Sequence, residues 1–275
     1  MVSYLTPERR TRLARLGPTL RYLSATEVHV YALAISASVL LSFFPFCNVM
    51  LSFCRNVLHW RAAEEAIYLA LNDYFPGEMA TFLKRNLAFY GGRLQWTSMV
   101  LLLFTANGIF EPLEVALNRA GGEVKNRSYL KNQAVALGMI FLCGALALAS
   151  LMLTGLNRDF MGKWDSIAPV QGWINLLMFK LAAVPLSILA LFLIYWLLPN
   201  RKIEPRAVVL PSIAIGLSLE AMKYVNVLTW GWFGQKLQRE YGPFYRSVAI
   251  VLWSFFASLL VLAGAEWTAR RRTES

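Results

Sequence analysis

Long apolar runs, separated by short polar segments, dominate the pattern of this chain. Six of the runs reach the roughly 20 residues that an α-helix needs to cross the hydrocarbon core of a bilayer. They are Val28–Cys54, Gln95–Leu117, Asn132–Leu156, Gln171–Leu198, Ala207–Trp230 and Ser247–Thr268. A short polar turn, Gln235–Pro243, is expected between the last two. The pattern therefore predicts an all-α, polytopic membrane protein with six transmembrane helices.

The polar segments suggest a division into a cytoplasmic amphipathic arm (1–27), a six-helix transmembrane domain (28–268) and a cytoplasmic basic tail (269–275). In the arm, leucines recur at helical spacing beside four arginines. This favours a basic amphipathic helix that lies on the membrane surface or packs in the cytosol. Residues 55–94 are predicted to be an outer amphipathic segment. It would hold two interfacial helices, Arg61–Leu71 and Pro76–Tyr90, each too short to cross the bilayer.

Composition and charge agree with a membrane protein. The chain is 57% hydrophobic and 16% charged, whereas soluble domains are about half apolar and a quarter charged. The net charge is +11. With both termini in the cytoplasm, the inside segments hold 15 Lys and Arg in 56 residues, against 10 in 70 outside. That bias follows the positive-inside rule. Anionic lipid therefore explains the charge, and no nucleic-acid partner is expected.

The residues offer little catalytic chemistry. The chain has two histidines, and neither belongs to a cluster with metal-ligand spacing. No GxxxxGK[ST] phosphate loop and no GxSxG nucleophile elbow occurs. The three cysteines lie within apolar runs and are expected to be packing residues. We therefore expect no enzymatic activity, no catalytic residue, no bound metal and no cofactor.

The most informative polar residues are charges inside the apolar runs. Glu220 and Lys223 are spaced i,i+3, so they share a helical face and can touch. At about 1.5 Å per residue, Glu220 lies about 15 Å below the outer end of its run and Lys180 about 13 Å below the outer end of its own. We expect Lys180 to approach Glu220 and to give the site a net positive charge. Lys180, Glu220, Lys223 and Asn226 are predicted to bind an anionic head group. The alternative is a polar latch that only locks the helices together.

Other residues are predicted to have structural or gating roles: Pro45, Asn107, Glu111, Glu114 and Glu266. Pro45 should kink or break the first helix, which would then line a pathway, unless this segment serves ordinary tight packing. Glu111 and Glu114 are expected to pair with basic residues of the following loop, such as Arg119. Glu266 is expected to meet the arginines at 270–272.

Seven short segments together resemble one family. They are Leu41–Pro45 (LSFFP), Asn72–Pro76 (NDYFP), Glu114–Asn118 (EVALN), Tyr195–Arg201 (YWLLPNR), Leu219–Lys223 (LEAMK), Tyr241-Gly242 and Gly264–Glu266 (GAE). Their order and spacing resemble the YihY/BrkB family of bacterial inner-membrane proteins over essentially the whole chain. Members of this family were formerly mislabelled ribonuclease BN, and the chemistry of this chain does not support that label.

The resemblance implies a six-helix protein of the bacterial cytoplasmic (inner) membrane with both termini cytoplasmic. Some members are linked to envelope integrity and to lipid or lipopolysaccharide-precursor export. The leading hypothesis is a transporter or flippase-like protein for an amphiphilic anionic envelope molecule such as a lipid. The alternative is a non-transporting membrane scaffold or envelope-integrity factor. The expected partners are membrane lipids, including an anionic lipid or envelope precursor, and the oligomeric state is left open.

Overall fold

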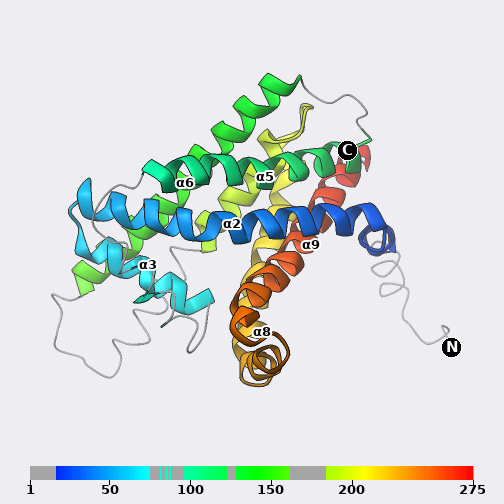
Figure 1. Cartoon of the computed structure of the whole chain (residues 1–275). Coiled ribbons are helices and arrows are strands. Elements are labelled where there is room, and N and C mark those ends of the chain that lie inside the picture. Colours follow the sequence, from blue (N-terminus) through cyan, green and yellow to red (C-terminus); the bar gives the residue numbers. More distant parts are fainter. Residues whose placement is uncertain are drawn as a thin grey trace.

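The computed structural model describes residues 17–74, 96–122, 128–161 and 184–274, together with positions 81, 84, 85 and 87. Within these residues every regular element is helical (Figure 1). The labelled elements are α2 (Thr26–Asn56), α3 (Arg61–Tyr74), α5 (Trp96–Ala120), α6 (Tyr129–Met161), α8 (Pro205–Tyr241), the 3-10 turn η1 (Gly242–Phe244) and α9 (Tyr245–Glu274). Residues 17–23 and Val184–Leu197 are also helical. The predicted all-α class is confirmed for this part of the chain.

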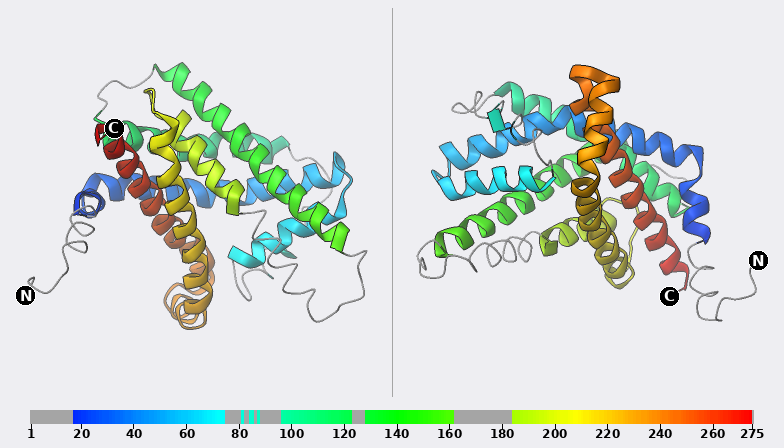
Figure 2. Two further views of the ribbon diagram at one scale, coloured as in Figure 1. Left: turned by 180° about the vertical axis from the view of Figure 1, so that it is seen from behind. Right: turned by 90° about the horizontal axis from the view of Figure 1, so that it is seen from below.

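The long helices pack around α2 and α9. α2 lies along α5 and also packs against α9. α8 and α9 form an antiparallel hairpin that η1 closes, and α3 lies against α2 and α6. The carboxyl end of α9 and the amino end of α2 lie on the same side of the molecule, and the tip of the hairpin extends away from them (Figures 1 and 2).

The buried core is shared at one end of the molecule and divided at the other. The largest cluster takes residues from α2, α5, α6, the helix Val184–Leu197, α8 and α9, among them Val28, Leu113, Met139, Leu198, Val208 and Leu262. A second cluster joins the end of α2 to α3 and Ile250. A third holds Leu237, Tyr245 and Ala249 of the hairpin. We call the end with the shared core the junction end and the tip of α8 and α9 the hairpin end.

Four of the predicted spans coincide with helices of the structure, namely α2, α5, α6 and α9. Pro45 is predicted to kink or break the first helix. The break is wrong, because α2 continues through this residue from Thr26 to Asn56, while the kink stays a prediction. A proline inside a helix removes only its own N–H from the ladder, and neighbouring helices can restore the lost contacts. Pro45 is buried in the packed face of α2, which agrees with tight packing.

The fifth helix is longer than its apolar run. α8 extends from Pro205 to Tyr241, so the predicted turn from Gln235 is wrong. The polar residues before Tyr241 continue the helix, and the chain reverses only at Gly242, whose φ is +53°. Glycine adopts this left-handed conformation without the steric cost that other residues meet.

Three described stretches are long and apolar enough to cross a membrane: Thr26–Asn56, Lys131–Ser150 and Pro205–Arg271. The third contains both helices of the hairpin, and Val184–Leu197 is a shorter apolar helix. Six transmembrane helices therefore stay a prediction. α3 confirms a helix where the first interfacial one is predicted, and its place at the interface stays a prediction. Most of Pro76–Tyr90, the first half of Gln171–Leu198 and the beginning of the arm lie outside the described residues.

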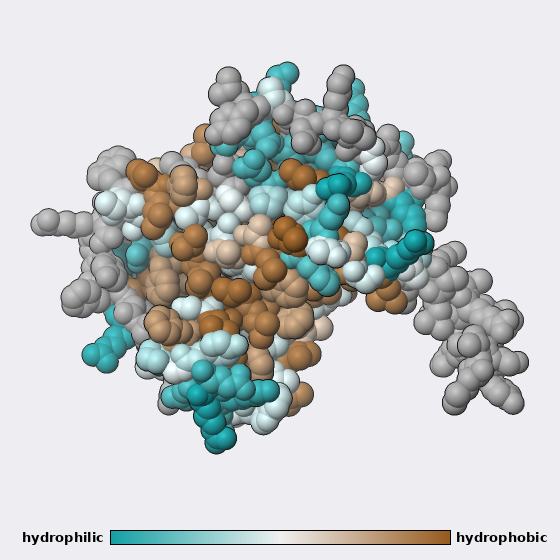
Figure 3. All heavy atoms as spheres, turned by 45° about the vertical axis from the view of Figure 1, so that its right-hand side comes forward, coloured by the Kyte–Doolittle hydropathy of each residue, from teal (hydrophilic) through white to brown (hydrophobic). Residues whose placement is uncertain are grey.

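The surface of the long helices is apolar. α8 buries Val208 and Ile215 while it exposes Leu217 and Leu228. Figure 3 shows hydrophobic side chains across the middle of one face and hydrophilic ones at the hairpin tip. Such a surface suits hydrocarbon rather than water. An apolar surface of this kind is typical of a membrane protein.

Candidate functional site

A stripe of buried residues on α8 carries the candidate site. Its members follow one another at spacings of three, four or their sums, which places them on one face of the helix: Val208, Ser212, Ile215, Lys223, Asn226, Gly234 and Leu237. α8 packs against α9; Val208 and Ile215 of this stripe belong to the shared core, and Leu237 belongs to the hairpin cluster. Lys223 and Asn226 therefore stand at two positions where a purely structural helix would carry apolar side chains.

Lys223 forms an ion pair with Glu220, as the i,i+3 spacing predicts. The Nζ atom of Lys223 contacts Oε2 of Glu220, and the two side chains are 10% and 16% exposed. Removing a charge from water costs several kcal/mol unless a partner compensates it. The carboxylate supplies that compensation within a single helix. The two side chains thus compensate each other within the bundle.

The position of the pair along α8 coincides with the division of the core. Ile215 belongs to the shared core at the junction end, and Leu237 belongs to the cluster of the hairpin. Lys223 lies about 12 Å beyond Ile215 and about 21 Å before Leu237 along the helix axis. Lys223 and Asn226 are therefore the buried polar residues of α8 at the level where the helices cease to share one core.

Lys180 lies outside the described residues, so its approach to Glu220 stays a prediction. Of the predicted substrate-binding residues, the structure brings together Glu220 and Lys223, with Asn226 one turn further along the same helix. Glu220 and Lys223 carry opposite charges and balance each other. The predicted net positive charge of the site therefore depends on Lys180.

A second group of polar contacts joins the helices at the junction end. The side-chain oxygen of Asn118, at the end of α5, accepts a hydrogen bond of 2.7 Å from the backbone N–H of Asn200. Nη1 of Arg201 donates to the carbonyl oxygen of Gly121 at 2.6 Å. This bond satisfies a carbonyl just beyond the end of α5, where the helix itself offers no partner. Together the two bonds tie the end of α5 to the segment that leads into α8.

Tyr195 and Gly264 form the tightest packing of this end. The hydroxyl of Tyr195 donates to the carbonyl oxygen of Val261 in α9 at 2.8 Å, and Tyr195 is fully buried. A Cβ atom added to Gly264 would lie 2.3 Å from that hydroxyl oxygen and 2.6 Å from Cγ1 of Ile215. Glycine is thus the residue that lets Val184–Leu197, α8 and α9 meet at one point.

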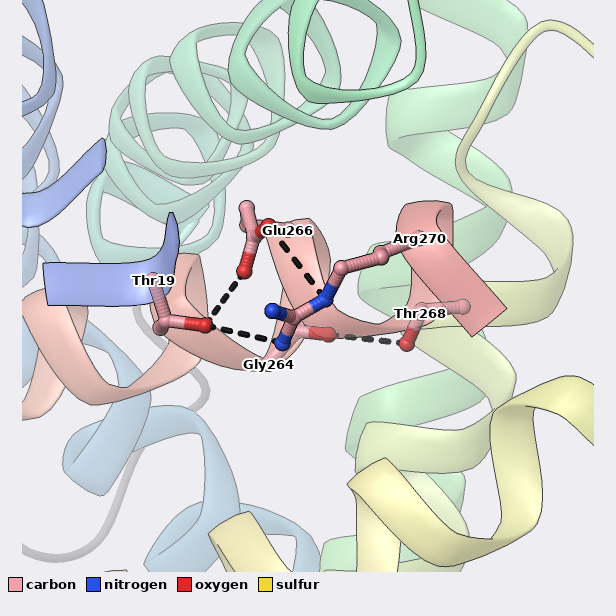
Figure 4. A network of polar contacts seen from close by, with 5 residues as sticks. All are labelled: Thr19, Gly264, Glu266, Thr268 and Arg270. Atoms are coloured by element: carbon pink, nitrogen blue, oxygen red, sulfur yellow. Dashed lines mark hydrogen bonds and ion pairs between the residues drawn. The ribbon is translucent and has the colours of Figure 1, made fainter. Parts of the chain in front are cut away.

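The segment before α2 is held to the end of α9 by Glu266 (Figure 4). The hydroxyl of Thr19 donates to Oε2 of Glu266 at 2.5 Å and accepts from Nη2 of Arg270 at 3.1 Å. Nε of Arg270 lies 3.7 Å from Oε1 of Glu266. The predicted pairing of Glu266 with a nearby arginine is therefore confirmed. Thr19 adds a contact that the apolar pattern did not indicate.

The remaining gating candidates have different surroundings. Glu114 is buried, and the amide of Asn132 in α6 faces its carboxylate, 2.8 Å from Oε1 in the orientation that lets the NH2 group donate. Glu111 is exposed. Arg119, which we expected near these acids, instead pairs with Glu27 at 3.1 Å and donates to the hydroxyl of Tyr31. The side chain of Asn107 lies outside the described residues. Among the residues that the structure describes, no group of three or more His, Cys, Asp or Glu could hold a metal ion.

Sequence reasoning had named Asn118, Tyr195 and Gly264 only as parts of short motifs. The structure gives these motifs a common place, because three of the seven segments meet at the junction end. Their partners are far away along the chain, so no local pattern could pair them. The signal for these residues in the sequence was that small, amide and aromatic residues recur beside the apolar runs.

Apolar helices, an apolar exposed surface and buried charges define a helical membrane protein. The chain belongs to the BrkB family, whose model, described as virulence factor BrkB, matches residues 19–275. This confirms the resemblance that the seven motifs indicated.

Two curated relatives are both described as UPF0761 membrane proteins. A UPF0761 membrane protein of Acinetobacter baylyi is 23% identical over 90% of this chain and 59% of its own length. A UPF0761 membrane protein of Chromobacterium violaceum is 27% identical over 71% of this chain and 46% of its own length. The chain thus spans about half the length of these curated relatives. No solved structure matches it.

Proposed function

We propose that this protein is a transporter or flippase-like protein for an amphiphilic anionic envelope molecule, with Lys223, Glu220 and Asn226 at its head-group site. It resides in the bacterial inner membrane with both termini in the cytoplasm, and it acts without enzymatic chemistry. Membrane lipids, and among them an anionic lipid or envelope precursor, are its partners.

The observation that carries the proposal is the burial of Lys223 and Asn226 on the bundle-facing stripe of α8. Ionisable residues inside membrane spans are costly, and they commonly mark a pathway for ions or substrates. Here the two buried residues lie at the level where the shared core ends. A head group that enters from the divided side of the core would meet these residues first.

The Glu220–Lys223 pair suits reversible binding of an anion. Without substrate, the carboxylate of Glu220 neutralises the ammonium group of Lys223. A phosphate or carboxylate head group can compete for the same ammonium, because charge-assisted hydrogen bonds to either anion have similar geometry. The amide of Asn226 can donate to a second oxygen of the head group. Return of Lys223 to Glu220 would then release the substrate.

Reconstitution into liposomes tests the proposal. Liposomes with fluorescent phosphatidylglycerol in both leaflets are treated with dithionite, which bleaches the outer leaflet alone. We expect the protein to raise the bleached fraction above half, and Asn226→Ala to slow this exchange. Ser212→Ala is the matched control, because Ser212 is buried on the same stripe and its hydroxyl bonds to the carbonyl of Val208 in its own helix. Bleaching that stays at half with wild-type protein would contradict the proposal.

The second candidate, a non-transporting scaffold, has its own supporting observation. The junction end joins α5, α9 and the segment before α8 through several direct hydrogen bonds, and the Glu220–Lys223 pair is contained within one helix. In that case the polar residues only fix helix packing. Wild-type protein that exchanges lipid no faster than protein-free liposomes would favour the scaffold.

A further inference from the structure

The lipid-facing side of α8 carries a graded series of side chains toward the hairpin end. Leu228 is 86% exposed and Trp232 is 70% exposed. Lys236 follows with a side chain that is 53% exposed, and Arg239 is exposed one turn later. At about 100° per residue, these four positions lie within a sector of about 80°. Hydrocarbon, aromatic and cationic groups therefore succeed one another along a single face.

The length of the apolar part of this face matches the bilayer. On this face the exposed apolar residues begin at Leu210 and include Leu217 and Leu228. From Leu210 to Leu228 the helix rises about 27 Å, close to the roughly 30 Å of a hydrocarbon core. Trp232 lies about 6 Å further along the axis. It thus falls at the level where aromatic rings favour the head groups.

Lys236 reaches back over Trp232. Its Nζ atom lies 5.8 Å from the centroid of the indole ring, within the range of a cation–π interaction. Helical side chains point toward the amino end of their helix, so the ammonium group lies nearer the bilayer than its own Cα. Glu240 is 3.9 Å from the same ammonium. An exposed pair of this kind is weak and leaves the ammonium available to a stronger anion.

The chain around Trp232 and Lys236 carries a net positive charge. Between Leu228 and Arg246 the chain carries Lys236, Arg239 and Arg246 against the single acid Glu240, a net charge of +2. Each basic group near an anionic membrane surface is worth roughly 1 kcal/mol. The charge and the depth of this face both fit the phosphate of an anionic lipid.

We propose that Trp232 and Lys236 form a binding site for one anionic phospholipid on the outside of α8 at the hairpin end. Its phosphate bonds to Nζ of Lys236 beside Arg239, its glycerol backbone lies against the ring of Trp232, and one acyl chain runs along Leu228. Glu240 competes with the phosphate for Lys236. This site is distinct from the Lys223 stripe, because 13 residues turn the helix by about 220°, to the opposite side. It does not depend on the proposed transport.

Native mass spectrometry of the purified protein in detergent tests this site, with phosphatidylglycerol, phosphatidylcholine and acyl-free glycerophosphoglycerol as probes. We expect the double variant Lys236→Gln/Arg239→Gln to lose phosphatidylglycerol affinity by about 25-fold, or about fivefold for each cation. Phosphatidylcholine binding should change little. Lys202→Gln, an exposed lysine outside this face, is the matched control and should keep wild-type affinity. Glu240→Gln should raise the affinity for phosphatidylglycerol, because it removes the competing anion.

Three results would overturn the proposal. They are equal phosphatidylglycerol affinity in the double variant and Lys202→Gln, an equal loss for both lipids, and binding of glycerophosphoglycerol as tight as that of the intact lipid. Because the four positions are exposed, the variants should fold as the wild type does. The thermal unfolding midpoint, followed by circular dichroism, checks this directly. In addition, Glu240→Gln should raise the affinity, and misfolding cannot produce such a gain.

Discussion

Asn118 accepts a hydrogen bond of 2.7 Å from the backbone N–H of Asn200, a residue 82 positions further along the chain. Both residues belong to motifs of the BrkB family, one at the end of α5 and one in the segment before α8. The bond fixes the end of one helix to the start of the hairpin. It makes the junction end the place where the bundle is held together, while the opposite end has a divided core.

Asn118→Leu should destabilise the protein by about 1–3 kcal/mol, because it removes the buried acceptor of the part-buried N–H of Asn200 and nearly keeps the volume. Thermal unfolding in detergent measures the loss. Thr229→Val serves as the control, since the hydroxyl of Thr229 bonds to the carbonyl of Val225 within its own helix. Equal midpoints for the two variants would show that the Asn118 bond does not stabilise the junction end.

Gly264→Ala should destabilise by about 1–3 kcal/mol, because the new methyl group overlaps the Tyr195 hydroxyl and Ile215. Tyr195→Phe removes the closest atom and should recover part of the loss in the double variant. Gly138→Ala makes the same change in α6, where nothing lies within 4 Å of the new atom. It should be neutral or stabilise by up to about 1 kcal/mol. A Gly264→Ala protein as stable as Gly138→Ala would contradict the close contact.

Thr19→Val should loosen residues 17–23 from α9, since it removes both the donor to Glu266 and the acceptor for Arg270. Hydrogen exchange of the amides in 17–23 should become faster while that of α9 remains unchanged. Ser24→Ala is matched to it, because the hydroxyl of Ser24 bonds only to the nearby carbonyl of Arg21 among the described contacts. Faster exchange in both variants alike would point to general fraying.

The pKa of Tyr22, which lies in the same segment before α2, predicts a loss of stability at alkaline pH. Burial, with the neighbouring Tyr31 and Glu266, raises the pKa of Tyr22 from 10.0 to about 12. The folded state therefore favours the neutral phenol. This stabilisation is complete below pH 10 and is lost as the pH rises toward 12. Between these values the unfolding midpoint of the wild type should fall more steeply than that of Tyr22→Phe, and parallel curves would exclude a contribution from Tyr22.

The apolar pattern predicted a helix well where that helix ends close to the end of its apolar run. It located α2, α5, α6 and α9 to within a few residues of their ends, because burial in lipid requires the same run of residues that the helix provides. It ended the fifth helix too early at Trp230, since polar residues up to Tyr241 can continue a helix beyond the hydrocarbon. It also predicted a kink or break at Pro45, and α2 continues through this residue without a break.

The contacts of the candidate site were also predictable only in part. Contact between Glu220 and Lys223 follows from i,i+3 spacing, so the sequence was sufficient. The contacts of Asn118 with Asn200 and of Tyr195 with Val261 join distant segments, and helical periodicity contains no information on them. The motifs marked these residues without pairing them. Depth matching of Lys180 with Glu220 stays a prediction, because Lys180 lies outside the described residues.

The central claim is that Lys223 and Glu220 serve a substrate rather than helix packing alone. Glu220→Gln by itself should destabilise by about 3 kcal/mol, because it removes the carboxylate that compensates the buried ammonium group of Lys223. The double variant Glu220→Gln/Lys223→Met removes both charges and should regain most of that stability, as neutral replacements of buried ion pairs commonly do.

The most direct measurement is therefore the rate of phosphatidylglycerol exchange between leaflets by this double variant in liposomes, together with its unfolding midpoint. The proposal predicts a midpoint near that of the wild type and exchange reduced to the rate of protein-free liposomes. A stable double variant that exchanges lipid at the wild-type rate would contradict it.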